Sequence, residues 1–262
     1  MDSAFSILYG LEDAAYRQRP GVSQSELKVA MDCPQRLEAM RRGIRQPETP
    51  AMFEGKLLHS SGLEPDTFEQ TYAVCGPRNT KAGKEQAREI EAAGQIAITQ
   101  AQWNKAMGFR LALAQNPLAS SLLSSGEPEV SIFSEDDETG LAIKGRLDWI
   151  QPNGTIVDLK TVGAGNASPK EFAKQVASFS YHLQAAHYLE LAQADRFVFI
   201  VVEREAPYLI SVVELDQAAL IEGENIRRRA LRLVADCELS GDWPGYTPEL
   251  QTLSLPSWAF EY

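Results

Sequence analysis

The sequence is poor in cysteine and histidine, with three residues of each among 262. Cys33, Cys75 and Cys237 are far apart and odd in number, which argues against a disulfide framework and against a clustered zinc or iron–sulfur site. No apolar run approaches the roughly 20 residues that a membrane-spanning helix needs, and the first residues show no basic region followed by an apolar one. We therefore expect a cytoplasmic protein with reduced thiols and no membrane partner.

Positive charge is also scarce, since 25 lysines and arginines stand against 36 acidic residues and the formal net charge is −11. A nucleic-acid-binding protein normally has a basic surface, so this balance argues against such a partner. The basic residues are nevertheless clustered, in the segment 17–45 and at Arg227–Arg229 with Arg232. We expect these clusters to face an anionic substrate and the acidic stretch Glu135–Glu138 to face outward. The alternative is that the arginines only solvate helix surfaces.

One charged stretch interrupts an otherwise apolar, strand-like pattern. Residues 144–161 alternate on either side of Pro152–Gly154, which is typical of a β-hairpin with glycine where a positive φ is needed. If the loop has three residues, Asp148 lies directly across from Asp158. Lys160 then follows on the same face of the sheet, because side chains two apart on a strand point the same way.

Two carboxylates held this close repel each other unless something balances them. A hard divalent cation with oxygen ligands supplies the missing counter-charge. A lysine beside such a cation can orient a water or stabilise charge that builds on a phosphoryl oxygen. The alternative is a surface hairpin with an ordinary Asp–Lys pair, which the apolar neighbours Ile156, Val157 and Leu159 disfavour.

The arrangement of Asp148 followed by Asp158-Leu159-Lys160 resembles the PD-(D/E)xK nuclease signature, although Leu147 stands where the signature has proline. The resemblance extends over nearly the whole chain to the nuclease domain of the RecE-type exonucleases (exodeoxyribonuclease VIII). Four further blocks occur in the same order as in that family: Gly21–Leu27, Gly55–His59 followed by Leu63–Pro65, Tyr181–Tyr188, and Leu253–Ala259.

The resemblance implies a set of site residues. Its metal ligands for Mg²⁺ or Mn²⁺ are His59, Asp148, Asp158 and the main-chain carbonyl of Leu159. Lys160 is the catalytic amine, and Gln184 and Tyr188, one helical turn apart, contact DNA beside the metal. Glu129 either completes the ligand set, directly or through water, or is an exposed glutamate at the start of a strand. From the residues alone, His59 could also be a core histidine, and the helix carrying Gln184 could simply pack on the sheet.

The same resemblance implies a restriction-endonuclease-like fold, an α/β arrangement with helices on both faces of a mixed sheet. The expected activity is Mg²⁺-dependent exonuclease digestion of linear double-stranded DNA, 5′ to 3′, leaving 3′ strands for a single-strand annealing protein as in phage recombination. Family members act as ring-shaped homo-oligomers. An endonuclease of the same fold, an inactive DNA-binding module, and a structural role without divalent dependence are the alternatives.

We expect one nuclease domain over residues 1–262, mainly helical at 1–125, with the sheet core and the last helix at 126–262. Helices are predicted at about 24–31, 35–42, 51–63, 85–98, 102–115, 118–123, from 169, 180–193 and 216–235; strands are predicted at 129–133, 141–150, 155–160, 197–203 and 208–215. Residues 1–20 and 66–85 are expected to be irregular. The apolar tail is expected to dock on its own domain or on a neighbouring subunit.

Overall fold

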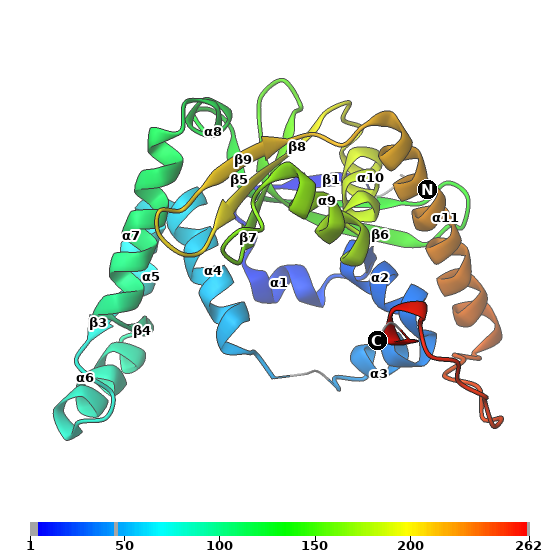
Figure 1. Cartoon of the computed structure of the whole chain (residues 1–262), viewed down its shortest axis with the longest axis horizontal. Helices are drawn as coiled ribbons and strands as arrows, with labels where there is room; N and C mark the ends of the chain where they lie inside the picture. The colour runs from blue at the N-terminus through cyan, green and yellow to red at the C-terminus, as the bar shows by residue number, and fades with distance from the viewer. Residues whose placement is uncertain (1–4, 45–46, 261–262) are drawn as a thin grey trace.

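The computed structural model describes residues 5–44 and 47–260, which form a mixed α/β fold (Figure 1). The first part is mainly helical: β1 (Ser6–Leu8), α1 (Asp13–Gln18), β2 (Val22–Ser23), α2 (Gln24–Asp32), α3 (Pro34–Arg41), α4 (Pro50–Leu63), α5 (Pro65–Thr71), β3 (Tyr72–Cys75), α6 (Lys81–Ala92), β4 (Ile96–Thr99), α7 (Gln100–Gln115) and α8 (Pro117–Leu122). The second part carries most of the sheet: β5 (Glu127–Glu135), β6 (Ala142–Ile150), β7 (Ile156–Val162), α9 (Pro169–Ser178), α10 (Tyr181–Ala192), β8 (Phe197–Glu203), β9 (Ile210–Val213), α11 (Gln217–Ser240) and a 3₁₀ turn (Ser257–Phe260).

Capping side chains set the start of several helices. Ser23 and Glu26 form a reciprocal capping box, which starts α2 at the predicted residue 24. Ser168 caps α9 ahead of Pro169, and Asp216 caps α11 by accepting a hydrogen bond from the Ala219 amide at 2.8 Å. These local signals explain why the predicted starts of α2, α9 and α11 were correct to within one residue.

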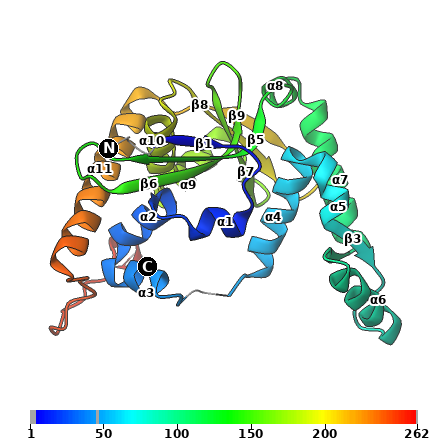
Figure 2. The ribbon, with the colours of Figure 1, turned by 180° about the vertical axis from the view of Figure 1, so that it is seen from behind.

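Seven strands form the main sheet, in the order β1-β5-β6-β7-β8-β9, with β2 pairing with β6 outside this path. β7 and β8 run parallel in the interior of the sheet, and every residue of β8 is buried. β9 pairs with β8 in antiparallel fashion, as predicted. Figure 2 shows β1 beside β5 at the opposite edge. A central strand that is buried on both faces is apolar along its whole length, which is why β8 lacks alternation.

Helices cover both faces of this sheet. On one face, α2, α9, α10 and α11 pack on side chains such as Ile156 and Phe199. On the other face, α4, α5, α7 and α8 pack on Leu159 and Ile200. Because side chains alternate along a strand, β7 and β8 contribute to both cores. The expected fold class, a mixed sheet flanked by helices, is confirmed.

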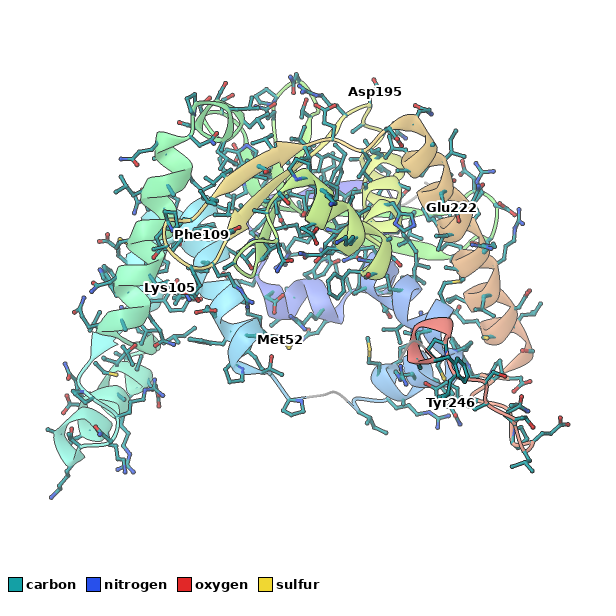
Figure 3. The ribbon with its side chains drawn as sticks, in the orientation of Figure 1. Met52, Lys105, Phe109, Asp195, Glu222 and Tyr246 are labelled. Atoms are coloured by element: carbon teal, nitrogen blue, oxygen red, sulfur yellow. The ribbon has the colours of Figure 1, made fainter. Side chains whose placement is uncertain are left out.

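The α4–α7 pair builds one wall of the second core. Figure 3 shows Lys105 and Phe109 on the side of α7 that faces α4 and the β8–β9 connection. The Lys105 ammonium group lies 2.6 Å from Glu54 of α4 and 2.6 Å from Glu205. Phe109 is fully buried. The contacts hold α4 against the sheet.

Residues 66–85 are more regular than predicted. They contain α5, β3 and the start of α6, and β3 pairs with β4 in a separate parallel two-stranded sheet. The predicted helix at 85–98 was placed too late, because Thr80 caps α6 and residues 96–99 form β4. Figure 1 shows that β3, β4 and α6 extend from the end of the molecule opposite α11.

Both ends of the described chain differ from expectation. Residues 5–20 are not a loose arm, since β1 extends the sheet and α1 follows it. In the tail, Trp243 packs against the first core and the Tyr246 hydroxyl accepts a hydrogen bond from Arg36 at 2.8 Å. Further on, Leu250 and Leu253 are 99% and 85% exposed. The contacts of Trp243 and Tyr246 dock the first residues of the tail on their own domain, and docking on a second subunit stays a prediction.

The three cysteines are buried and free. Of the helices within residues 5–44 and 47–260, none combines the length and the apolar character needed to cross a membrane.

Candidate active site

The hairpin β6–β7 places the two predicted aspartates opposite each other. Gly154 has φ of 82°, and the Gln151 amide donates to the Thr155 carbonyl at 2.9 Å, which closes the three-residue loop. The ladder then pairs Ile150 with Ile156 and Trp149 with Val157. Continued by one residue, this register sets Asp148 across from Asp158, as the sequence predicts.

The two strands separate where the acids begin. The β6–β7 ladder ends at Trp149 and Val157, and beyond it the Asp148 carboxylate accepts a hydrogen bond from the Leu159 amide at 2.9 Å. A side chain therefore spans the gap that main-chain pairing would otherwise fill. Because the strands separate here, a side chain of α4 can contact the main chain of β7.

His59 reaches into this opening from α4. Its Nε2 atom lies 3.0 Å from Asp148 Oδ2 and 2.9 Å from the Leu159 carbonyl oxygen. A carbonyl oxygen only accepts, so Nε2 carries the hydrogen and donates it. His59 is not a plain core histidine, because its imidazole contacts the Asp148 carboxylate and its side chain is 24% exposed.

Glu129 joins His59 and Asp148 from the neighbouring strand. It is a non-glycine residue with φ of 51°, and its Oε1 lies 3.9 Å from His59 Nδ1. One ligand atom from each of His59, Glu129 and Asp148 can be chosen so that all lie within 4.8 Å of one another. Glu129 therefore lies beside the proposed metal ligands His59 and Asp148, which favours a role in the site over that of an exposed glutamate at the start of a strand.

Asp158 and Lys160 lie on the same face of β7, toward α10. The Lys160 ammonium lies 2.5 Å from Asp158 Oδ2, and the Gln184 amide donates to Asp158 Oδ1 at 2.5 Å. Asp158 is 1% exposed, and Oδ2 makes no hydrogen bond of good geometry. Asp158 is thus a buried acid held by one cation and one amide, and it lies outside the three-residue group formed by His59, Glu129 and Asp148.

The charges of these groups are strongly interdependent. Burial alone would lower the pKa of His59, but the Asp148 carboxylate outweighs it and raises the pKa to about 9. Burial would raise the pKa of Asp148, whereas His59 and then Lys160 hold it below its usual value. Burial and the Asp148 charge raise the pKa of Asp158 to about 6 and that of Glu129 to about 7. His59 and Lys160 beside Asp158, and His59 and Arg146 beside Glu129, lower these two pKa values but do not offset the effects that raise them.

The donor set fits a divalent cation. Carboxylate and carbonyl oxygens with one imidazole are ligands that Mg²⁺ and Mn²⁺ accept. In the metal-free arrangement, protonated His59 supplies positive charge at the point where these donors meet. The buried Oδ2 of Asp158, without a well-aligned donor, is a further oxygen that a cation could use. The predicted ligands His59, Asp148 and Leu159 therefore meet at one point, with Glu129 beside them.

Tyr188 is more buried than a residue expected to contact DNA. It is 6% exposed, and its ring packs among core aromatics, with its centroid 6.3 Å from that of Phe197. A Cβ added at Gly145 would lie 2.9 Å from the Tyr188 ring, so the ring fills space over β6. Burial, and then the charges of Tyr16, Asp148 and Asp158, raise the pKa of Tyr188, so it lies next to the site as expected. Its contact with DNA stays a prediction, and Gln184 contacts Asp158.

Two residues of this region had no assigned role in the sequence analysis. The Lys28 ammonium lies 5.1 Å from the ring centre of Tyr181, and the Lys160 ammonium lies 4.8 Å from the same ring. Burial raises the pKa of Glu64, and the charge of the nearby His59 opposes this increase. The block Gly21–Leu27 ends just before Lys28. The sequence signal that could have pointed to Lys28 is its position between two apolar residues, Leu27 and Ala30, which are buried.

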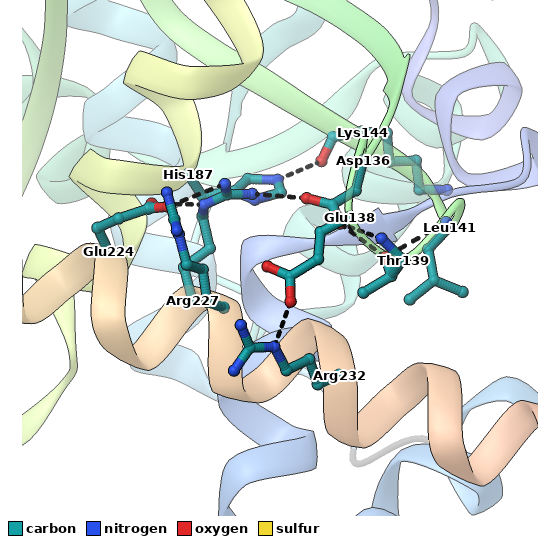
Figure 4. Close-up of polar contacts among 10 residues, drawn as sticks. Asp136, Glu138, Thr139, Leu141, Lys144, His187, Glu224, Arg227 and Arg232 are labelled. Carbon is teal, nitrogen blue, oxygen red and sulfur yellow. Dashed lines mark hydrogen bonds and ion pairs between the residues drawn. The ribbon is translucent and has the colours of Figure 1, made fainter.

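The arginines of α11 do not face the site, contrary to expectation. Figure 4 shows Arg227 between Asp136 and Glu224, and Arg232 beside Glu138. Arg227 is 3% exposed and its Nη1 lies 3.3 Å from Asp136. The ion pairs Arg227–Asp136 and Arg232–Glu138 therefore join the β5–β6 turn to α11. Arg228 and Arg229 pair with Glu224 and Glu222 of α11 itself.

A mixed sheet with Asp148 and Asp158-x-Lys160 at the end of a hairpin defines the class of PD-(D/E)xK nucleases. The family model described as "PDDEXK-like domain of unknown function (DUF3799)" matches residues 23–255. The chain belongs to this family.

Two solved structures are similar to this chain, and the first of them shares its fold. A protein from Eubacterium rectale, described as a candidate exonuclease, superimposes with a TM-score of 0.65 at 15% identity and covers 95% of this chain and 96% of its own. A phage-related exonuclease from Haemophilus somnus aligns over 86% of this chain and 98% of its own, with a TM-score of 0.36 and 16% identity. Among curated proteins, no sequence matches this chain.

Proposed function

We propose that this protein is a divalent-metal-dependent exodeoxyribonuclease that degrades linear double-stranded DNA. The observation that carries this function is the convergence of His59, Asp148 and the Leu159 carbonyl at 3.0 Å or less beside the buried Asp158–Lys160 pair. The combination supplies hard ligands for Mg²⁺ or Mn²⁺ and a lysine next to them.

Each residue has a defined task in phosphodiester hydrolysis. A bound divalent cation polarises a phosphoryl oxygen and lowers the pKa of a water molecule. Asp148, Glu129 and the Leu159 carbonyl offer oxygen atoms, and His59 offers Nε2 once its proton has left. Lys160 carries positive charge that offsets the charge developing on the phosphoryl group. Gln184 fixes the second oxygen of Asp158, so that this carboxylate keeps Lys160 in place.

The finer parts of this function rest on the resemblance of the five sequence blocks to RecE-type exonucleases. These parts are 5′ to 3′ polarity, delivery of 3′ strands to a single-strand annealing protein, and assembly of several copies into a ring around DNA. Mg²⁺ is the metal we propose, with Mn²⁺ as a substitute.

The test is digestion of end-labelled linear duplex, blocked separately at each 5′ and each 3′ terminus, with Mg²⁺ and with EDTA. We expect metal-dependent loss of linear duplex that a 5′ block prevents and a 3′ block does not, and no cutting of a closed circular duplex. Lys160→Ala should end digestion while DNA is still bound.

Two results would change the assignment. Cutting of the closed circle would make the protein an endonuclease of the same fold, and digestion in EDTA would remove the metal from the chemistry. His59→Ala is the control for the ligand set, because unchanged activity at limiting Mg²⁺ would take His59 out of it.

A further inference from the structure

The ring of Tyr181 lies beside two ammonium groups next to the site acid Asp158. Lys160 of β7 and Lys28 of α2 lie 4.8 Å and 5.1 Å from its centroid. Lys160 has Asp158 as its counter-ion, whereas Lys28 has no carboxylate partner among residues 5–44 and 47–260. Burial and the neighbouring Lys160 lower the pKa of Lys28 to about 7. The Asp158 charge opposes this shift only in part, and an anion beside Lys28 would oppose it further.

A second aromatic ring continues this surface outward. The Phe179 centroid lies 5.7 Å from that of Tyr181, and Phe179 is 55% exposed. The ring sits at the end of α9, where Ser180 adopts φ of 51° and lets α10 begin directly at Tyr181. A left-handed serine costs free energy, and such conformations persist where the surrounding structure holds them. The junction keeps Phe179 beside Tyr181 rather than in the core.

We propose that Phe179 and Lys28 form a nucleotide subsite, in which Phe179 stacks on a base and Lys28 binds the adjacent backbone phosphate of the strand being cut. This subsite rests on the proposed nuclease function and adds the class of group bound next to the scissile phosphate. Aromatic stacking on bases is tolerant of sequence, because every base has a π face. A free strand end has an unstacked base to offer, whereas an intact duplex does not.

The groups of this subsite meet at the Tyr181 ring. Lys160 lies against Asp158, where the phosphate would be cut, and the Tyr181 ring contacts both Lys160 and Lys28. Phe179 contacts the same ring and is 55% exposed. In the proposed subsite, the strand contacts the exposed Phe179 and Lys28 next to the point of cutting at Lys160. Phe179 and Lys28 bind ground state and transition state alike, so their loss raises KM more than it lowers kcat.

The test uses DNA with 2-aminopurine at the first, second or third nucleotide from the end, because stacking quenches its fluorescence. Binding is measured with Ca²⁺ in place of Mg²⁺, so that the DNA is bound without being digested. The same samples are then checked to verify that the DNA has stayed intact. We expect one position to be quenched by the wild type. Phe179→Ala should abolish that quenching and weaken binding roughly 10-fold, Phe179→Trp should retain both, and Phe179→Leu should lose the quenching.

Lys28→Met should weaken binding and reduce the salt dependence of log K by about one, while Lys28→Arg should keep both. Leu118→Ala and Lys84→Met, exposed residues on other helices, are the matched controls and should match the wild type. Thermal melting confirms that each variant folds.

Quenching that survives in Phe179→Ala, or an unchanged salt dependence in Lys28→Met, would overturn the subsite. Digestion by the wild type with Mg²⁺ is measured in parallel. If the wild type digests DNA but Phe179→Ala shows unchanged quenching, only the subsite is wrong. If the wild type binds with quenching but never digests, the nuclease function is wrong and the subsite stands.

Discussion

His59 carries a proton at the point where the proposed metal ligands meet. Its Nε2–H donates to Asp148 and to the Leu159 carbonyl, and the Asp148 charge raises its pKa to about 9. A cation that takes Nε2 as a ligand must displace this proton, so binding and proton release are coupled. The imidazolium of the metal-free protein thus competes directly with the metal.

Metal affinity should therefore rise with pH. Between the pKa of Glu129, about 7, and that of His59, about 9, the apparent affinity should increase up to about tenfold per pH unit. Calorimetric titration of Mn²⁺ in buffers of different ionisation enthalpy measures the protons released. His59→Ala should bind more weakly and lose this pH dependence. An affinity for the wild type that is flat across this range would contradict the role of His59.

Glu129 should have the opposite effect on stability from an ordinary surface acid. Burial and Asp148 raise its folded pKa from 4.5 to about 7, so the folded state resists ionisation and loses stability as pH rises through this window. Glu129→Gln should stabilise the metal-free protein by about 1–3 kcal/mol above pH ~7, and the gain should vanish below the unfolded pKa. Urea denaturation in EDTA near pH ~8 and near pH ~4 measures it. Glu127→Gln, exposed on the same strand, is the control, and destabilisation by Glu129→Gln near pH ~8 would contradict the pKa shift.

At the scale of elements, two glycines in helices have opposite surroundings. A Cβ at Gly223 of α11 would lie 2.2 Å from the His182 carbonyl oxygen, so the crossing of α10 and α11 requires glycine there. A Cβ at Gly55 of α4 would meet only Thr161 Oγ1, at 3.7 Å. Gly223→Ala should cost about 3 kcal/mol or more, because backbone must move. Gly55→Ala should stabilise by up to about 1 kcal/mol, since alanine favours helix. Urea denaturation compares the two, and a mild Gly223→Ala variant would mean that the helices can separate without loss.

The elements that the sequence predicted correctly are those with local signals. The start of α2 at Gln24, the glycine turn at Gly154 and the strand β7 depend on neighbours in the chain, and each is found. β3 and β4 were missed because each has four residues and is stabilised by pairing with the other. In the site, the Asp148–Asp158 register followed from the hairpin alone. The inward position of Tyr188 and the proximity of Lys28 depend on how α10 and α2 pack, which no local pattern encodes.

At the scale of the whole molecule, most positive charge is already committed to acids of the same chain. Figure 1 places α11 along one end of the molecule, where Arg228 pairs with Glu224 and Arg232 with Glu138. With a net charge of −11, long-range attraction of DNA is weak, so the proposed DNA binding would depend on the cations near the site and on the proposed metal. Under the same proposal, the acidic surface would limit attachment to intact duplex away from an end.

This distribution predicts that the arginines of α11 are dispensable for DNA binding. The double variant Arg228→Ala with Arg232→Ala should bind linear duplex within about twofold of the wild type, with the same salt dependence, because neither side chain releases counter-ions from DNA. Fluorescence anisotropy over a range of salt concentrations measures both quantities, with Lys28→Met as the comparison that should change. Each phosphate contact that is lost reduces the slope of log K against log salt by about 0.9. A slope smaller by about two in the double variant would therefore place both arginines on the DNA and would mean that their ion pairs with Glu224 and Glu138 open when DNA binds.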